Sequence, residues 1–336
     1  MERYSNLDKI LHSIVLNSDF ISELLFDLEY KLFSDREVQN DKHVFITGLA
    51  RSGTTILMRA LHNSNLFSSL TYTDMPFVLA PNLWQSITKF NRKHIKKHER
   101  SHGDGILVNE ESPEAFEEVF WRLFLGNTYI RGNCLLPHDI PDTVLEKFTS
   151  YINVVCRRYD KNRYLSKNNN NILRLKSLSQ HLNNSLILVP FRHPLDQAYS
   201  LLTQHKNNLN SSKFHTNYMK WLSHFEFGDL HKRYTFSDNT RPEYDPGGIN
   251  YWLDVWVEVY EYIYSVAMNR IENIKLVSYE LLCQNDNHWE SICHAAEIPL
   301  VPVEFRLTKK VHKQACNEDL LKSAMHVYER LDKLCK

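Results

Sequence analysis

The sequence lacks an excess of either charge. Its 40 lysines and arginines balance 40 aspartates and glutamates over 336 residues, so the overall charge favours neither nucleic acid nor an acidic membrane surface as a partner. Any anion-binding site must therefore be local. The chain also lacks an apolar run of the roughly 20 residues that span a bilayer, and its start lacks the basic-then-apolar pattern of a signal peptide. We expect a cytoplasmic protein without a membrane span, and the oligomeric state stays open.

Paired metal-binding or disulfide motifs are also missing. The six cysteines form no C-x-x-C pair and no zinc-finger spacing; they are Cys134, Cys156, Cys283, Cys293, Cys316 and Cys335. A chain of this length does not need a disulfide scaffold, so we expect reduced thiols. His94, His98 and His102 recur at a spacing that could place them on one helix face, but further zinc ligands are lacking. We therefore predict no metal site.

What the sequence does contain is a glycine loop between a strand and a helix, at His43–Thr55 (HVFITGLARSGTT). Val44–Ile46 is a short run of strand formers, Gly48 and Gly53 bracket the loop, and helical character follows. In this arrangement backbone N–H groups and a helix N-terminus meet an anion. The sequence therefore predicts a phosphate-like ligand here.

One residue of the usual nucleotide-triphosphate loop is absent. The spacing from Gly48 to Thr55 nearly matches G-x-x-x-x-G-K-[ST], but Thr54 stands where the lysine is required. That lysine normally reaches the β- and γ-phosphates, so its absence argues against ATP or GTP hydrolysis. Arg51 supplies a positive charge from within the loop instead.

Strand-like and helix-like segments alternate along the chain. This pattern predicts one α/β domain over residues 1–336 with a mostly parallel sheet. The expected strands are 44–46, 66–72, 172–176, 186–191 and 274–278. The expected helices are two within residues 1–40, then 54–63, 110–125, 142–164, 195–205, 250–270 and 317–334. For the helix at 110–125, Ser112 is the predicted N-cap and Pro113 the first helical residue. Residues 206–250 are expected to be an insertion that faces the substrate.

A second informative stretch is Leu186–Leu202 (LILVPFRHPLDQAYSLL). Arg192 follows a near-continuous apolar run, which is typical of a buried parallel strand. Ser200 lies eight residues later on the next expected helix. A guanidinium fork and a hydroxyl so placed can converge on one phosphate.

The ordered set of motifs resembles the sulfotransferases that use 3′-phosphoadenosine 5′-phosphosulfate (PAPS). The matching segments are RSGTT after the first strand, the strand-Arg-x7-Ser segment, and VSYELL at Val277–Leu282. The resemblance reaches from residue 43 to about residue 290 and implies a three-layer α/β fold with a central, mostly parallel sheet of about five strands, like that of P-loop nucleotide hydrolases. It implies sulfuryl transfer from PAPS to a hydroxyl or amine acceptor by in-line displacement, with 3′-phosphoadenosine 5′-phosphate (PAP) as product and no metal.

The resemblance also implies roles for particular residues. The loop that holds the 5′-phosphosulfate would be Arg51, Ser52, Gly53, Thr54 and Thr55, with Arg51 also meeting charge in the transition state. Arg192 and Ser200 would bind the 3′-phosphate, and Tyr279 would lie near the nucleotide. Lys167 precedes Arg192 by 25 residues, and a lysine at a similar offset in the tyrosyl-protein branch steadies the leaving phosphate.

The general base is left between several carboxylates. Asp74 follows the second expected strand, where related branches carry a carboxylate, and it is our first choice. Glu111 and Glu114 are the alternatives. They rank second because charged residues in the first turn of a helix are common without any catalytic role.

Two other functions remain open from the sequence. One is a P-loop kinase that uses ATP, although no strand ends in a magnesium-binding aspartate. The other is a nucleotide-binding protein without catalysis. The acceptor is undetermined: segments 74–105 and 206–250 should line its pocket, and their aromatic residues suit a small molecule, a sugar, a lipid or a tyrosine-containing peptide; these residues are Phe77, Trp84, Trp221, Phe225 and Phe227.

Overall fold

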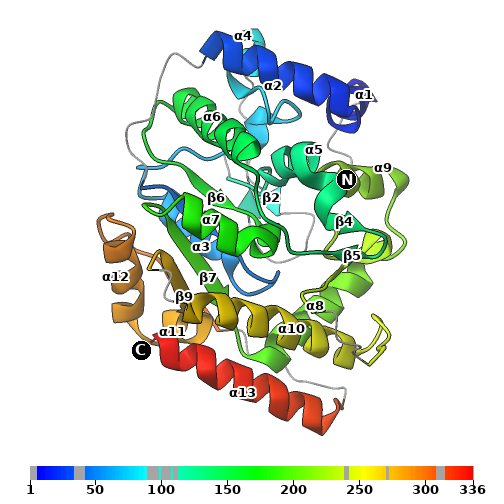
Figure 1. The fold of residues 1–336 in the computed structure, drawn as a ribbon, viewed down its shortest axis with the longest axis vertical. Coiled ribbons are helices and arrows are strands. Elements are labelled where there is room, and N and C mark those ends of the chain that lie inside the picture. The colour runs from blue at the N-terminus through cyan, green and yellow to red at the C-terminus, as the bar shows by residue number, and fades with distance from the viewer. Residues whose placement is uncertain are drawn as a thin grey trace.

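The structure is a computed structural model, shown in Figure 1. It describes residues 6–33, 42–88, 98–99, 107–108, 113–237, 242–269, 272–307 and 315–335. Glu110, Glu111 and Ser112 lie outside these ranges, as do His94 and His102.

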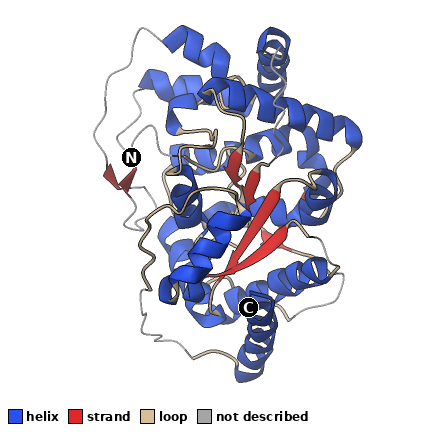
Figure 2. Cartoon of the chain, turned by 90° about the vertical axis from the view of Figure 1, so that its left-hand side faces the viewer, coloured by secondary structure: helices blue, strands red, loops and turns tan. Residues whose placement is uncertain are grey.

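A parallel sheet lies at the centre of the chain (Figure 2). Its four strands lie in the order β6 (Leu165–Lys167), β1 (Val44–Ile46), β7 (Leu186–Phe191) and β9 (Ile274–Ser278). Ile46 of β1 is in register with Lys167 of β6 on one side and with Leu188 of β7 on the other. Because all four strands run the same way, the residues that follow them meet at one edge of the sheet.

Helices cover both faces of this sheet, and the side chains of each strand alternate between two apolar clusters. Phe45 of β1 belongs to the larger cluster, whereas its neighbours Val44 and Ile46 belong to the smaller one. The smaller cluster includes side chains of α3 (Thr54–His62), α11 (Tyr279–Gln284) and α12 (Asp286–Ala295). The expected three-layer α/β architecture is therefore confirmed.

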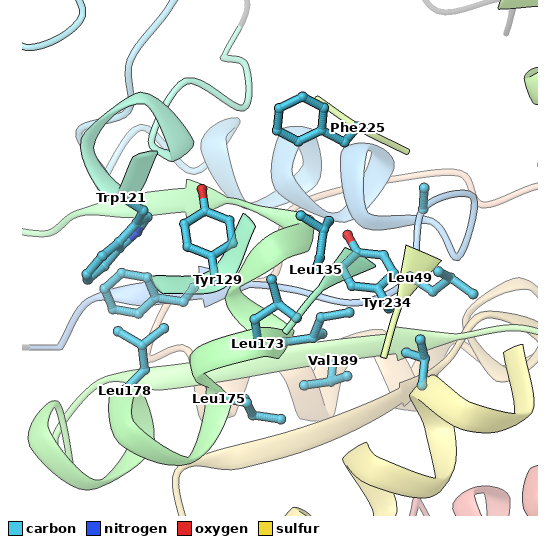
Figure 3. Packing of buried hydrophobic residues seen from close by; sticks show 14 of the residues in the cluster. Leu49, Trp121, Tyr129, Leu135, Leu173, Leu175, Leu178, Val189, Phe225 and Tyr234 are labelled. Carbon is cyan, nitrogen blue, oxygen red and sulfur yellow. The ribbon is translucent and has the colours of Figure 1, made fainter. Parts of the chain in front are cut away.

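The larger cluster is rich in aromatic side chains, part of which Figure 3 shows. It draws on α5 (Glu118–Tyr129), α6 (Asp142–Tyr159), α7 (Leu175–His181), α8 (Pro194–Asn208), α10 (Ile249–Met268) and α13 (Glu318–Cys335). Helix α10 packs against α8 and α13, at the bottom of Figure 1. The two helices expected in residues 1–40 are α1 (Asn6–Asn17) and α2 (Asp19–Phe33), which lie at the top together with α4 (Pro81–Thr88).

The remaining short elements connect these layers. They are η1 (Tyr72–Asp74), β2 (His98–Glu99), β3 (Leu107–Val108), β4 (Ile130–Arg131), β5 (Cys134–Leu135), η2 (Asn169–Arg174), α9 (Lys213–Trp221), η3 (Gly228–Leu230) and β8 (Arg233–Tyr234). His98 lies in strand β2, so the expected helix face of three histidines is not formed there. None of the described helices is long and apolar enough to cross a membrane.

Two expected strands are wrong. Residues 66–72 make only single bridges, from Ser68 to Tyr164 and from Thr71 to Pro113. The Thr71 hydroxyl and the Asp74 carboxylate instead form a capping box that begins the 3-10 turn η1. Residues 172–176 lie in η2 and α7, because the Asn168 side chain accepts a hydrogen bond from the N–H of Asn170 and begins a helical turn. The described sheet accordingly has four strands rather than about five.

The start of the helix expected at 110–125 is also wrong. Helix α5 begins at Glu118, and Pro113 is extended in its bridge to Thr71. Glu114 therefore lies in an extended segment before the helix, and not on a solvated first turn. This change places the Glu114 carboxylate beside the loop described next.

Candidate active site

Each of the four parallel strands delivers one candidate residue to the same edge of the sheet. Lys167 is the last residue of β6, and the glycine loop with Arg51 follows β1. Arg192 follows β7 directly, and Tyr279 follows β9 directly. The sequence placed these residues far apart along the chain, and the parallel topology brings them together.

The glycine loop adopts backbone angles that depend on glycine. Gly53 has a φ of +104°, and a Cβ added to it would lie 2.6 Å from Cδ2 of Tyr279. Arg51 itself has a φ of 68°, in the left-handed region that few non-glycine residues adopt. Helix α3 starts at Thr54 with no side-chain cap on its N-terminus, so the positive end of its dipole is available to an anion.

Gln197 holds the glycine loop in place by hydrogen bonds to its backbone. Its Nε2 donates hydrogen bonds to the carbonyl oxygens of Leu49, at 3.2 Å, and Ala50, at 3.0 Å. Its Oε1 in turn accepts from Nε1 of Trp256 at 3.0 Å. Sequence reasoning missed Gln197, although it lies three residues before Ser200 on the same helix. A buried amide that faces a glycine loop leaves no signature in the sequence.

The glycine loop and the Arg192/Ser200 pair are adjacent. Nε of Arg51 donates to Oγ of Ser200 at 3.0 Å. The guanidinium carbon of Arg192 lies 5.6 Å from the ring centre of Tyr279, the ring that covers Gly53. The Tyr279 hydroxyl donates to the carbonyl oxygen of Arg306 at 3.1 Å, which anchors the ring to a late segment of the chain.

A cleft opens beside this loop. The described residues that line it are Ala50, Arg51, Thr54, Thr55, Glu114, Lys167, Asn169, Gln204, Asn208, Met219, His224, Glu226 and Phe227. The sequence predicted the first part of this list, up to Lys167, apart from Ala50. The polar residues from Asn169 onward were missed.

Two groups with proton-transfer chemistry lie in the cleft. Oε2 of Glu114 accepts a hydrogen bond from the Tyr72 hydroxyl at 2.8 Å, and its Oε1 accepts from the Ala115 N–H at 3.1 Å. His224 lies across from them, with Nε2 3.0 Å from the Ala115 carbonyl oxygen. Since a carbonyl can only accept, Nε2 carries the hydrogen and a neutral His224 keeps its lone pair on Nδ1.

Asp74 is not brought to the cleft. Its carboxylate is fully buried, pairs with Nε of Arg158 at 3.1 Å, and accepts from the Tyr159 hydroxyl and the Thr71 N–H. Burial raises the pKa of Asp74, while Arg158 acts in the opposite direction. A carboxylate enclosed in this way stabilises the start of η1 and does not reach an acceptor.

The cleft's walls are held by a buried polar network. The Arg174 guanidinium makes two hydrogen bonds to Glu118, at 3.0 and 3.1 Å, and both side chains are fully buried. Burial alone would raise the pKa of Glu118, but the Arg174 charge and hydrogen bonds hold it below its ordinary value. Asn168 donates to Glu118 at 2.7 Å. The network thereby joins α5 to Asn168, the residue between Lys167 and Asn169.

The aromatic residues expected in the acceptor pocket have separate locations. Phe77 and Trp84 stack on each other with ring centres 4.6 Å apart. Trp221 and Phe225 belong to the larger apolar cluster, and Phe227 alone among the five lines the cleft. Within the described residues no group of three or more histidine, cysteine, aspartate or glutamate side chains is placed to hold a metal.

The strand, the uncapped helix and the loop with Arg51 define an α/β protein with a candidate anion site at the carboxyl edge of its sheet. The sulfotransferase family model matches residues 43–302, which cover the loop, Arg192, Ser200 and Tyr279. The chain belongs to the sulfotransferase family, and the resemblance stated from its motifs is confirmed.

Two solved structures are similar to the chain. Sulfotransferase STF9 from Mycobacterium avium is similar over 97% of this chain and 78% of its own, at 11% identity and a TM-score of 0.51. Sulfotransferase STF1 from Mycobacterium tuberculosis H37Rv aligns over 98% of this chain and 87% of its own, at 12% identity and a TM-score of 0.49. At such identity the first similarity supports the fold alone. No curated protein matches the sequence closely enough to count as a relative.

Proposed function

We propose that the protein transfers a sulfuryl group from PAPS to a hydroxyl group, with Glu114 as the general base. One observation supports this most strongly: the Arg51–Ser200 hydrogen bond joins two anion-binding motifs, so that one adenosine bisphosphate can meet both. The glycine loop fits PAPS because it leaves room at Gly53. A Cβ at this position would fill the space next to the Tyr279 ring.

The donor side of the site would be formed by cations and backbone amides. Thr54 and Thr55, at the uncapped start of α3, would bind the 5′-phosphosulfate, and Arg51 and Lys167 would stabilise charge on it. Arg192 and Ser200 would bind the 3′-phosphate. PAPS supplies an activated sulfuryl group whose departure leaves a phosphate and needs no metal.

The chemical step would then need little covalent work from the protein. The acceptor oxygen bonds to sulfur while the bond from sulfur to the bridging oxygen breaks, and PAP leaves with that oxygen. Glu114 takes the proton of the acceptor hydroxyl. The hydrogen bond from Tyr72 holds the carboxylate in place in the cleft, whereas the enclosed Asp74, our first choice from the sequence, has no path to the acceptor.

A nucleotide panel separates this function from the kinase and the binding-protein alternatives. A ligand at 100 times its Kd should stabilise the fold by about 2.7 kcal/mol, so thermal unfolding is measured with PAP, PAPS, ATP and GTP. We expect PAP and PAPS to raise the Tm strongly. Stabilisation by ATP with magnesium instead would favour a kinase.

Sulfuryl transfer from PAPS is measured next. We expect Glu114→Gln to keep the stabilisation by PAP and to lose transfer from PAPS. Glu114→Gln with undiminished transfer would remove this residue from the mechanism and would make His224 the base, which His224→Gln then examines.

A further inference from the structure

We propose that the acceptor is a neutral polyhydroxylated molecule, such as a sugar, which binds to the wall of the cleft formed by Asn169, Gln204, His224 and Glu226. This inference rests on the proposed function, since it names the substrate class for the same site. These side chains come from η2, from α8 and from the segment after α9, and all of them line the cleft.

Asn169 and Gln204 together indicate a polar ligand. Both residues are 6% exposed and line the cleft, and Oδ1 of Asn169 is a buried atom without a hydrogen-bond partner among the described residues. Buried polar groups are nearly always paired, and an unpaired one costs about 1–3 kcal/mol. An amide offers one donor nitrogen and one acceptor oxygen. A hydroxyl group can meet both, because it donates and accepts.

The neighbouring groups add acceptors. Oε1 of Glu226 accepts from Nδ2 of Asn169 at 2.9 Å, which leaves Oε2 without a hydrogen bond from the described residues. Nδ1 of His224 carries the lone pair when the ring is neutral. Acceptors of this kind call for a ligand with several O–H or N–H donors, and they disfavour a phosphate or a carboxylate.

The charge and the apolar surface of the cleft further restrict the class of acceptor. Because Arg51 and Lys167 would face the donor, the carboxylates of Glu114 and Glu226 are left to face the acceptor among the described residues of the cleft, so a neutral acceptor fits better than an anion. Met219 and Phe227 are the large apolar side chains in that set. They offer a patch for the C–H face of a sugar ring, but not the enclosed apolar slot that a sterol or a simple phenol requires.

The experiment compares acceptor classes on the PAP-loaded protein and in PAPS turnover. The panel holds N-acetylglucosamine, lactose, cellobiose and myo-inositol as polyols, with 4-methylphenol, a tyrosine peptide, a sterol and an alkylamine as the competing classes. We expect at least one polyol to raise the Tm above that with PAP alone and to be sulfated. Transfer to a phenol, sterol or amine without any polyol, or no polyol binding at high concentration, would overturn the inference.

Substitutions of the cleft residues test whether they bind the acceptor. Gln204→Leu should raise KM for the polyol at least 10-fold with a small effect on kcat, and Glu226→Gln should raise it as well. Gln180→Leu makes the same change at an exposed position of α7 and should leave KM unchanged. An unchanged KM in Gln204→Leu would contradict the inference.

Binding of PAP distinguishes a failure of the proposed function from a failure of the inference about the acceptor. A variant that keeps stabilisation by PAP is folded and retains the donor site, so a change in its KM reports on the acceptor alone. If PAP fails to bind to the unmodified protein, the proposed function fails. If PAP binds and sulfate goes to a different acceptor class, only the polyol inference fails.

Discussion

Nε of Arg51, in the loop after β1, donates to Oγ of Ser200, in the middle of α8, at 3.0 Å. The two residues are 149 positions apart in the sequence. Their contact joins the two motifs that we propose bind the two ends of the donor, and the predictions about donor binding depend on it.

Removing either member of this pair should weaken binding of PAP. A hydrogen bond to a charged group contributes about 1.5–3 kcal/mol, so Arg51→Ala and Ser200→Ala should each raise the Kd for PAP by roughly 10- to 100-fold. Isothermal titration with PAP measures this. Arg131→Ala removes an arginine from an exposed position of β4 and serves as the control; an equal loss there would show that general charge, and not the pair, binds PAP.

Gly53 should not tolerate a side chain. Its φ of +104° and the 2.6 Å approach to Tyr279 make Gly53→Ala both strained and crowded, so we expect a loss of PAP binding and a Tm lower by several degrees. Gly132→Ala is the matched control, because Gly132 also has a positive φ but its Cβ would meet nothing within 4 Å. Equal effects of the two substitutions would show that backbone strain alone, and not contact with Tyr279, is responsible.

The ion pair of Arg174 and Glu118 should be costly to break. Both side chains are fully buried, and removing one partner of such a pair destabilises a protein by about 3–5 kcal/mol. Arg174→Met should therefore lower the free energy of unfolding by that amount in urea. Lys322→Met breaks the exposed pair with Asp319 and should cost at most about 1 kcal/mol. A loss of under 1 kcal/mol in Arg174→Met would contradict this account of the cleft's walls.

Three histidines should make the fold sensitive to mild acid. Burial lowers the pKa of His62, His138 and His231 to about 4 in each case, below the ordinary 6.5. The unfolded chain then binds more protons than the folded one between pH 6.5 and 4, so stability rises with pH through this window and is lost as pH falls.

Each of these histidines should lower the free energy of unfolding by about 1 kcal/mol when the pH falls from 6 to 5. Urea unfolding at several pH values measures it. His231→Gln should flatten the curve, because the folded protein holds this ring in its neutral form: Nδ1 faces the Glu226 carbonyl oxygen, 2.8 Å away, and Nε2 faces the Tyr251 hydroxyl. His326→Gln alters an exposed ring on α13 and should not change the slope. A slope that His231→Gln leaves intact would assign the acid sensitivity to other groups.

The residues that meet at the carboxyl edge of the sheet were predicted from the sequence for a physical reason. A glycine loop after an apolar strand has few conformations open to it, and Arg192 directly follows a strand whose continuous apolar run marks it as central. Strand β9 was predicted at its observed bounds because its apolar run is short and is followed by a helix start at Ser278. Local rules of this kind do not require knowledge of distant contacts.

The locations of Glu114, Asp74 and Gln204 could not be predicted in this way. Pro113 suggested the first turn of a helix, but its bridge to Thr71, a partner about 40 positions away, keeps Glu114 extended. Asp74 suggested a strand end, but its pairing with Arg158 encloses it. Gln204 lies on α8 without any local signal, and only the packing of α8 beside the cleft shows its importance.

The most direct measurement compares PAP with adenosine 5′-phosphate, which lacks the 3′-phosphate. If the two motifs bind opposite ends of one molecule, the unmodified protein should bind PAP at least 100-fold more tightly. Arg192→Ala and Ser200→Ala should remove most of that preference while adenosine 5′-phosphate binds as before. Equal affinity of the unmodified protein for the two nucleotides would contradict the account.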